Sequence, residues 1–431
     1  MDASPWKHPR LSKVKRSFSL RQWLFLGSGV ALIAATYGLV RLAFGLFLPD
    51  VERDLGLRPD AAGWVSSGAS AMYCVGAVVG FLVAARVPRV LVTAASGFAG
   101  VGALAMATAP GPWTFGIAAV LASTGAGLAS PALVQLVSRT VPESVQGTAQ
   151  AVVNSGTGPG LVAAGALALV LLPDWRTAWA WSGVFAVVVG VVLLLVSRGS
   201  GSGADRAAAP GTAWLAAHRR VLTLALLFGA GSAVVWTYGR SALVDAGAPV
   251  VVSVSAWIAL GVGGAAVAVT ARWTSGLRAR ALWAVTAGAV AVAVVALGLA
   301  PRATAVAMLA CAVFGWGYTA ATGALIAWTT ELDAARSSAG TSMLFVALVL
   351  GQAVGAAASG ALVGVSGYAA TFVVGAVVTA ASAVPAVVGR RGGPPHGDAA
   401  VTGVDAARSS GCTPATPRAS HGAPSRHPAA P

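Results

Sequence analysis

Charged residues are scarce in this sequence. They make up 10% of the 431 residues, whereas about 25% is usual in soluble domains, and 57% of the residues are hydrophobic. The apolar residues are gathered in many runs of at least about 18 residues with few or no charges, a length typical of membrane-spanning helices. The composition therefore excludes an ordinary soluble protein and predicts a chain that crosses a lipid bilayer several times.

Cysteine is rare as well. The three cysteines are Cys74, Cys311 and Cys412, and neither their odd number nor their spacing fits a disulfide framework or a metal site. No G-x-x-x-x-G-K-[ST] loop occurs, which argues against ATP as an energy source within this chain. We expect no cofactor, no metal and no enzyme activity, because the clustered His, Asp or Glu of a membrane enzyme are not found at the predicted membrane surface.

Twelve apolar runs are each long enough to cross the bilayer, since a helix needs about 20 residues to span about 30 Å of hydrocarbon. Lipid cannot pair backbone polar groups, so we expect helices; the short alternating strands of a barrel are not found. The predicted spans are 22–48, 62–85, 90–109, 113–137, 149–172, 177–197, 221–244, 250–271, 281–300, 303–329, 339–363 and 369–388. The expected fold class is an all-α polytopic membrane protein of two six-helix bundles.

Acidic residues and histidine are missing from these predicted spans. This absence argues against a proton relay through a carboxylate buried in the membrane. Asp50, Glu52 and Asp54 follow the first span and are interpreted as a solvated loop, although proton coupling through them stays open.

Lysine and arginine are distributed unevenly between the predicted loops. Of the 28 such residues, most fall in one set of alternating segments that includes both ends of the chain. The exceptions in the other set are Arg53, Arg58, Arg176 and Arg302. Because basic loops stay in the cytoplasm, both termini are expected to be cytoplasmic, and the protein multi-pass in the cytoplasmic (inner) membrane. The net charge of +15 belongs to these segments, so nucleic acid is not an expected partner.

A polar segment divides the spans into two groups. Residues 198–220 are rich in Gly, Ala and Ser and are interpreted as a flexible cytoplasmic linker. The first bundle is expected at 22–197 behind a basic tail at 1–21, and the second at 221–390. Residues 391–431 are rich in Pro, Ala, Ser and Gly without periodicity, which predicts a disordered cytoplasmic tail.

Two arginines lie inside predicted spans. Arg41 follows Tyr37 by four residues and Arg240 follows Trp236 by four, so each pair shares a helix face. An arginine within a span usually faces the bundle interior, where its guanidinium can bind a carboxylate or phosphate. Arg41 is the sharpest candidate for substrate binding, with snorkelling towards water as the alternative. For Arg240, snorkelling or a pair with Asp245 is favoured over substrate contact.

Other polar and aromatic side chains in the spans are candidates for lining a cavity. They are Tyr37, Asn154, Trp236, Trp316, Thr319 and Gln352. Hydrogen bonding between helices is the alternative for the amides, and packing is the alternative for the aromatic residues. Ser66, Ser70 and Tyr73 share one face of the second span, with the same two interpretations.

Two motifs resemble those of the major facilitator superfamily of secondary transporters, and the resemblance covers about residues 20–390. The loop after the second span resembles the family's G-x-L-A-D-R-x-G-R-R, with Gly80 and Arg89 matching and Ala84 at the acidic position. Gly80 and Arg89 are thus the candidates for a conformational-switch loop. The fifth span resembles the family's glycine-rich helix-packing motif, which is associated with antiporters. The residues of this motif are Gly147, Gly156, Pro159 and Gly160.

This resemblance implies that spans 1, 4, 7 and 10 line a central cavity, and that spans 2, 5, 8 and 11 flank the contact between the halves. It also implies a small-molecule substrate moved by alternating access. Arg41 and Arg240 favour an organic anion or small metabolite. Efflux of hydrophobic compounds by antiport is the alternative, and a non-transporting membrane sensor or scaffold is the alternative of another class. A proton is the candidate coupling ion, and we expect a monomer in the lipid bilayer.

Overall fold

The computed structural model describes residues 19–197, 211–274 and 276–387, which all belong to one compact unit. The predicted tail at 391–431 and most of the predicted tail at 1–21 lie outside the described residues. Below, the first half means the described residues before position 198, and the second half those after position 210.

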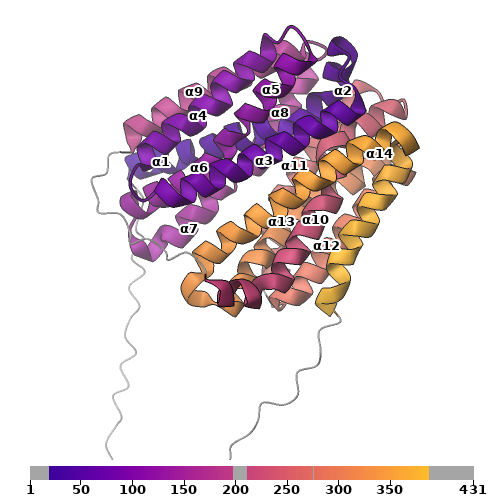
Figure 1. Cartoon of the computed structure of the whole chain (residues 1–431). Helices are drawn as coiled ribbons and strands as arrows, with labels where there is room; N and C mark the ends of the chain where they lie inside the picture. Colours follow the sequence, from indigo (N-terminus) through magenta and orange to yellow (C-terminus); the bar gives the residue numbers. More distant parts are fainter. Residues whose placement is uncertain (1–18, 198–210, 275, 388–431) are drawn as a thin grey trace, which may run out of the picture. The chain divides into compact units, whose positions relative to one another are not determined.

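Every regular element of the described residues is a helix (Figure 1). The helices are α1 (Leu20–Ile33), η1 (Ala34–Leu42), α2 (Ala43–Leu55), α3 (Pro59–Val83), α4 (Pro88–Ala107), α5 (Pro112–Ala122), α6 (Thr124–Thr140), α7 (Glu143–Asn154), α8 (Thr157–Leu171), α9 (Trp175–Val196), α10 (Thr212–Asp245), α11 (Val250–Thr274), α12 (Ala279–Leu299), α13 (Thr304–Leu332), η2 (Ala334–Arg336) and α14 (Ser337–Val387).

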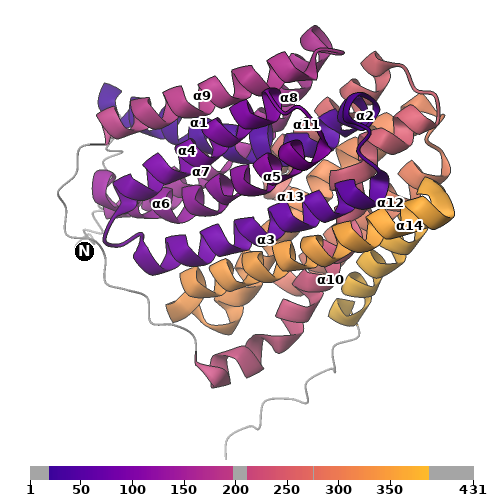
Figure 2. The ribbon, with the colours of Figure 1, turned by 45° about the horizontal axis from the view of Figure 1, so that its top comes forward.

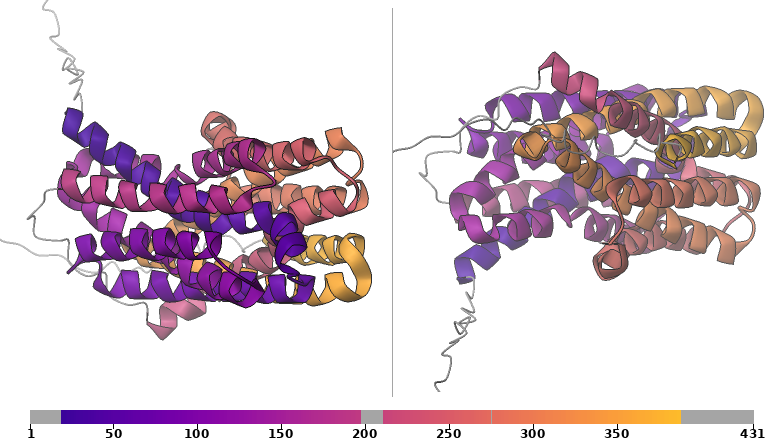
Figure 3. Two further views of the ribbon diagram at one scale, coloured as in Figure 1. Left: turned by 90° about the horizontal axis from the view of Figure 1, so that it is seen from above. Right: turned by 90° about the horizontal axis from the view of Figure 1, so that it is seen from below.

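The described residues contain 11 helical stretches long and apolar enough to cross a membrane, against twelve predicted spans. The difference lies in the last stretch, Ala339–Val384, whose 46 residues would be about 69 Å long as one straight helix. Gly367, with φ of 74° and ψ of 178°, interrupts α14 between the predicted spans 339–363 and 369–388. Figures 1 and 3 show the chain reversing direction within α14. Glycine permits this reversal because a residue with a Cβ is strained at such a φ.

The first stretch, Leu20–Leu55, is longer than the predicted span 22–48 and joins α1, η1 and α2 without a loop. Its middle part, η1, is a π-helix, a wider helix that is often found at functional sites. Because α2 continues to Leu55, the expectation of a loop for Asp50, Glu52 and Asp54 is wrong; Asp50 is buried, whereas Asp54 is exposed as expected. These three carboxylates lie on the last turns of a helix that packs against α10.

The second half begins earlier than expected. Helix α10 starts at Thr212, so the last residues of the predicted linker 198–220 are helical. His218 is buried in this part, with Nδ1 3.0 Å from the carbonyl oxygen of Trp214 and Nε2 3.1 Å from Oγ1 of Thr329. These contacts, within α10 and with α13, explain why the helix extends beyond the apolar run that predicts it.

The helix ends follow local signals. Pro59, Pro88 and Pro112 occupy the first turns of α3, α4 and α5, where the N–H that proline lacks would have no helical partner. Asp174 caps α9 by accepting a hydrogen bond from the N–H of Thr177 at 3.1 Å. Hydrogen bonds from Thr177 hold the pKa of this carboxyl below its usual value, so the cap persists at neutral pH.

Helices of the two halves meet in two matching pairs. Helix α3 packs along α14, and α8 along α11. Figure 2 shows α3 beside α14. The approach is close because small residues face each other: a Cβ at Gly63 of α3 would meet the backbone of Ala356 and Gly360 in α14. Predicted spans 2 and 11, and 5 and 8, therefore meet as the family resemblance implies.

The packing of α10 against α14 leads to a first prediction. Gly355 of α14 lies against the backbone of Ala230 in α10, without room for a Cβ. Gly355→Ala is expected to push these helices apart and to lower the free energy of unfolding by about 1–3 kcal/mol. Gly364→Ala, in the same helix with open space around it, is the control and should leave stability unchanged or slightly higher. Equal melting temperatures of the two purified variants would contradict this packing.

Candidate functional site: an arginine pocket between the halves

A pocket lies beside η1 and receives side chains from both halves. Its cavity volume is about 30 Å³, and it is bounded mainly by η1, α3, α10 and α14. Its polar lining residues are Arg41, Ser66, Ser70, Ser123, Thr237 and Gln352, and the other lining residues are apolar. No Asp or Glu is among the lining residues.

Arg41 is the charged group of this pocket. Its Nη2 donates hydrogen bonds to Oγ of Ser70 at 3.3 Å and to Oε1 of Gln352 at 3.0 Å. Its guanidinium carbon lies 4.7 Å from the centre of the Tyr73 ring. The Nε atom is buried without a hydrogen-bond partner, and within the described residues no carboxylate oxygen lies within 4.0 Å of Arg41. The pocket therefore holds a positive charge that neutral groups orient and no carboxylate neutralises.

The π-helix η1 positions Arg41 together with Tyr37. The Tyr37 hydroxyl lies 3.0 Å from that of Tyr73 and 2.9 Å from Oγ of Ser130, so η1 is bonded to α3 and α6. The predicted shared face is present, because Tyr37 and Arg41 both contact Tyr73. Gly38 brings η1 against the backbone of Gly160 in α8, where a Cβ would not fit.

Gln352 connects Arg41 to the second half. Its side chain lies on α14 and is buried, and its Nε2 donates a hydrogen bond to the Tyr318 hydroxyl of α13 at 2.9 Å. The path from Arg41 through Gln352 to Tyr318 thus joins three helices from both halves. Tyr318 is a site residue that the sequence analysis missed, because nothing in its span indicates which face meets Gln352.

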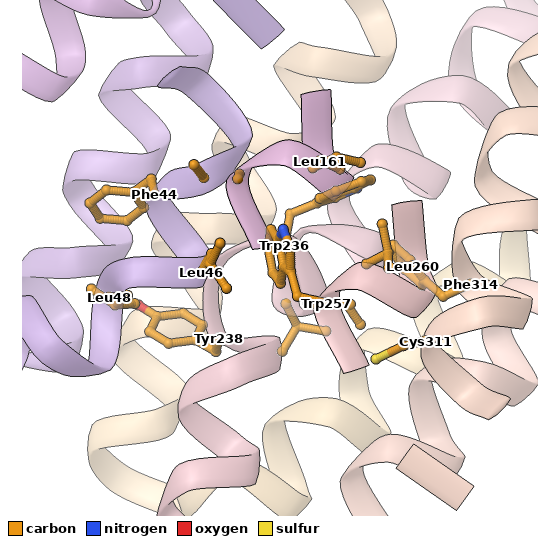
Figure 4. Packing of buried hydrophobic residues seen from close by; sticks show 14 of the residues in the cluster. Phe44, Leu46, Leu48, Leu161, Trp236, Tyr238, Trp257, Leu260, Cys311 and Phe314 are labelled. Carbon is orange, nitrogen blue, oxygen red and sulfur yellow. The ribbon is translucent and has the colours of Figure 1, made fainter. Parts of the chain in front are cut away.

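Trp236 lines the pocket and belongs to a cluster of four rings, here called the aromatic wall. Its ring centre lies 6.2 Å from that of Trp257, 5.4 Å from that of Phe314 and 5.1 Å from that of Tyr318. Figure 4 shows Trp236 between the helix that carries Phe44 and the side chains of Trp257 and Phe314. Of these four rings, Trp236 lines the pocket together with Arg41, so the pocket combines a cation with an aromatic ring.

Arg240 does not line this pocket, although it follows Trp236 by four residues. Its side chain is 1% exposed, and its Nη1 contacts Oδ2 of Asp50 at 2.5 Å and the carbonyl oxygen of Leu46 at 2.6 Å. Its Nε donates to Oγ of Ser253 at 3.2 Å. The expected snorkelling or pair with Asp245 is therefore wrong, because α2 carries the buried Asp50 alongside α10.

Three further predicted site residues lie away from the pocket lining. Asn154 is exposed at the end of α7, and Thr319 is exposed on α13. Trp316 donates from Nε1 to Oγ1 of Thr270 in α11 at 2.9 Å, a hydrogen bond between two helices of the second half. Of the predicted residues, the structure thus brings Tyr37, Arg41, Trp236 and Gln352 together. Ser70 and Tyr73, whose shared face was a candidate for lining a cavity, contact Arg41, and Tyr318 is connected to it through Gln352.

The predicted switch loop connects helices of the first half. A Cβ at Gly80 would touch the ring of Pro131 in α6, so this glycine permits close packing of α3 on α6. Arg89 donates from Nη1 to the carbonyl oxygen of Ser197 and lies 3.3 Å from its Oγ, which ties the start of α4 to the end of α9.

The glycine-rich motif packs at two of its positions. Gly156 lies against the carbonyl oxygen of Val30 in α1, and Gly160 against Ala34 in η1, with no space for a Cβ at either. Gly147 is exposed, with no atom within 4 Å of the place of a Cβ, and Pro159 is exposed as well. Within this motif, only Gly156 and Gly160 pack closely, and they hold α1 and η1 against α8.

Membrane-crossing helices from two halves that share a pocket with a half-buried cation define a polytopic membrane protein of transporter type. The chain belongs to the Major Facilitator Superfamily, whose family model matches residues 30–340. Members of this superfamily are transporters of small molecules and not enzymes.

Solved structures with the same fold are numerous among transporters. The nucleoside transporter NupG has a TM-score of 0.69 at 13% identity, over 86% of this chain and 98% of that chain. A bacterial homologue of the human lysosomal transporter Spinster, inward-facing and unoccupied, has a TM-score of 0.65 at 14% identity, over 86% and 96%. The xylose transporter XylE from E. coli, in a partially occluded inward-open conformation, has a TM-score of 0.64 at 13% identity, over 84% and 96%. Such low identities show the fold alone. No curated protein sequence matches this chain.

Proposed function

We propose that this protein is a secondary transporter that moves a small organic anion across the cytoplasmic membrane by alternating access. The observation that carries the proposal is Arg41, a cation in the pocket with a buried, unpartnered Nε and no carboxylate partner in the part of the chain that the structure describes. A guanidinium binds a carboxylate through two parallel hydrogen bonds, and Nε with one Nη forms such a fork. A ligand carboxylate would supply the countercharge that the protein does not.

The topology proposed for this transport is of twelve crossings in two six-helix bundles, 22–197 and 221–390. The reversal at Gly367 supports the twelfth crossing, since it divides a stretch too long for one. The distribution of Lys and Arg supports cytoplasmic termini. By this orientation, the loop before α3 is external and the loop before α4 is cytoplasmic.

The contacts between the halves support a state that is closed on the external side. Two hydrogen bonds join α3 to α10 on the external side of Arg41. Ser66 Oγ lies 2.9 Å from Thr237 Oγ1, and the Tyr238 hydroxyl donates to the carbonyl oxygen of Pro59 at 2.6 Å. Further out along α10, the Asp50–Arg240 pair joins this helix to α2. The similar Spinster homologue and XylE structures are described as inward-facing and inward-open, which agrees with this interpretation.

The second candidate function is efflux of hydrophobic compounds, with a proton as the coupling ion. The aromatic wall favours it, because aromatic rings and apolar lining residues bind hydrophobic molecules without a charged group. The two candidates differ in the role of Arg41, which is central for an anion and unfavourable for a hydrophobic cation.

Ligand stabilisation of the purified protein distinguishes the two candidates. Aromatic and aliphatic carboxylates, their neutral amides and the cation tetraphenylphosphonium are compared side by side in a thermal unfolding assay. We expect a carboxylate to raise the melting temperature, since a ligand at 100 times its Kd stabilises by about 2.7 kcal/mol, and its amide to do so much less. Stabilisation by the cation without any effect of carboxylates would support efflux and contradict the anion proposal.

A further inference from the structure

Glu52 occupies an unusual place at the contact between the halves. It lies on the last turns of α2, and its Oε2 accepts a hydrogen bond from Oγ of Ser241 in α10 at 3.3 Å. Its Oε1 is buried and has no hydrogen-bond partner. A carboxylate oxygen deprived of water needs a donor or a cation, and this one has neither.

The charged groups around Glu52 do not supply a cation. On its own helix, Arg53 contacts Asp50 and Asp54, and no ion pair with Glu52 is found among the described residues. On α10, Arg240 is occupied by Asp50. The other titratable groups near Glu52 carry no positive charge. They are the two tyrosines and two carboxyls Tyr238, Tyr368, Asp60 and Asp245.

Resting on the alternating access and orientation proposed above, we propose that Glu52 is a proton-binding site that locks the external side closed. In the closed state the carboxyl holds a proton, because the ionised group would have a buried Oε1 without water or a donor and no countercharge among the described residues. When the halves part, water reaches Glu52, and the proton leaves to the external solution. External pH thus sets the balance between the closed and the open external side.

This proton does not cross the membrane with the substrate. Between Glu52 and the pocket lie the Ser66–Thr237 hydrogen bond and the close contact of Gly45 with the backbone of Trp236. A proton bound on closure therefore returns to the side it came from. The site regulates the carrier and does not drive it, which separates it from a coupling carboxylate.

The direction of the pH response identifies the responsible carboxyl. Since the closed state binds one more proton at Glu52 than the open state, rising pH favours opening, by up to about tenfold in the open-to-closed ratio per pH unit. Protonation of Asp50 would act in the opposite direction, because it removes the partner of Arg240 and favours opening at low pH. Of these two carboxyls, only Glu52 predicts that the external side closes at low pH.

Distance measurements between the external ends test this inference. Spin labels are placed by Pro110→Cys and Arg302→Cys, two exposed positions in external loops of the two halves, in the full chain with Cys74, Cys311 and Cys412 replaced by alanine. With increasing pH, we expect the population with the longer label separation to grow in the parent protein. Glu52→Gln, which mimics the protonated carboxyl, should stay at the short separation throughout.

Three outcomes overturn the inference: no pH response in the parent, a response of opposite sign, or a response that persists in Glu52→Gln. Melting temperature in the absence of ligand checks that Glu52→Gln is folded. Carboxylate stabilisation is measured on the same variant to separate the two proposals. If Glu52→Gln loses the pH response and still binds carboxylates, the proton site at Glu52 and the anion substrate are both supported. If the pH response depends on Glu52 but no carboxylate binds, the proton site is supported and only the anion substrate is contradicted.

Discussion

Asp50→Asn is expected to destabilise the externally closed state by about 3–5 kcal/mol, the usual effect of removing one partner from a buried ion pair. Arg240 would then remain buried, at 1% exposure, with a charge that only the neutral groups around it could accommodate. The protein can relieve this by parting the halves so that water reaches the guanidinium. We therefore expect Asp50→Asn to shift the labelled protein to the longer separation at every pH.

The matched control is Asp60→Asn, which removes a carboxylate whose pair with Arg58 is largely exposed. Such surface pairs contribute about 0–1 kcal/mol, so this variant should resemble the parent. The double variant Asp50→Leu with Arg240→Met removes both charges and should recover much of the closed population. If Asp50→Asn and Asp60→Asn behaved alike, the buried pair would have no role in closure.

Arg41→Ala is expected to abolish carboxylate binding at concentrations that saturate the parent protein. Hydrogen bonds to charged groups contribute about 1.5–3 kcal/mol each, so loss of a bidentate pair weakens binding by at least about a hundredfold. Arg41→Lys keeps the charge but not the planar fork, and an intermediate loss is expected. The measurement is stabilisation and uptake of a labelled carboxylate by protein in liposomes.

Arg58→Ala is the control, since this arginine is 81% exposed in the proposed external loop. A purely structural role of Arg41 would weaken all ligands alike, so binding of the neutral amide is followed in parallel. We expect Arg41→Ala to bind the amide as the parent does and to lose the preference for the carboxylate. Equal carboxylate uptake by the parent and Arg41→Ala would contradict an anion-binding arginine.

Much of the helical architecture could be predicted because it depends on local properties of the chain. A run of about 20 apolar residues must form a helix in lipid, and the described helices cover the predicted spans with modest shifts at their ends. The shifts have physical causes. Helix α2 continues through Asp50 because that side chain forms an ion pair with Arg240. Helix α10 begins early because His218 is hydrogen-bonded to Thr329. Hydropathy does not register such polar contacts.

The candidate site was predictable in part, for a related reason. An arginine within an apolar run is conspicuous. Arg41, Trp236 and Gln352 line the pocket, and Tyr37 lies beside it in contact with Tyr73. Asn154, Trp316 and Thr319 are equally conspicuous by composition but lie elsewhere. The polarity of a side chain shows that burying it in lipid is unfavourable. Where the side chain points depends on the rotation of its helix about the helix axis, which the sequence does not show.

The sequence by itself determined that this chain is a helical membrane protein, because the energetics of placing peptide groups and charges in lipid act on each segment separately. It also determined that Arg41 and Arg240 need special surroundings. Only the tertiary structure decided that Arg240 pairs with Asp50, 190 positions away, while Arg41 faces a pocket without a carboxylate. The same holds for Glu52, which is left without a cation. These outcomes depend on which helices pack side by side and in which rotation, and neither is encoded in the apolar runs.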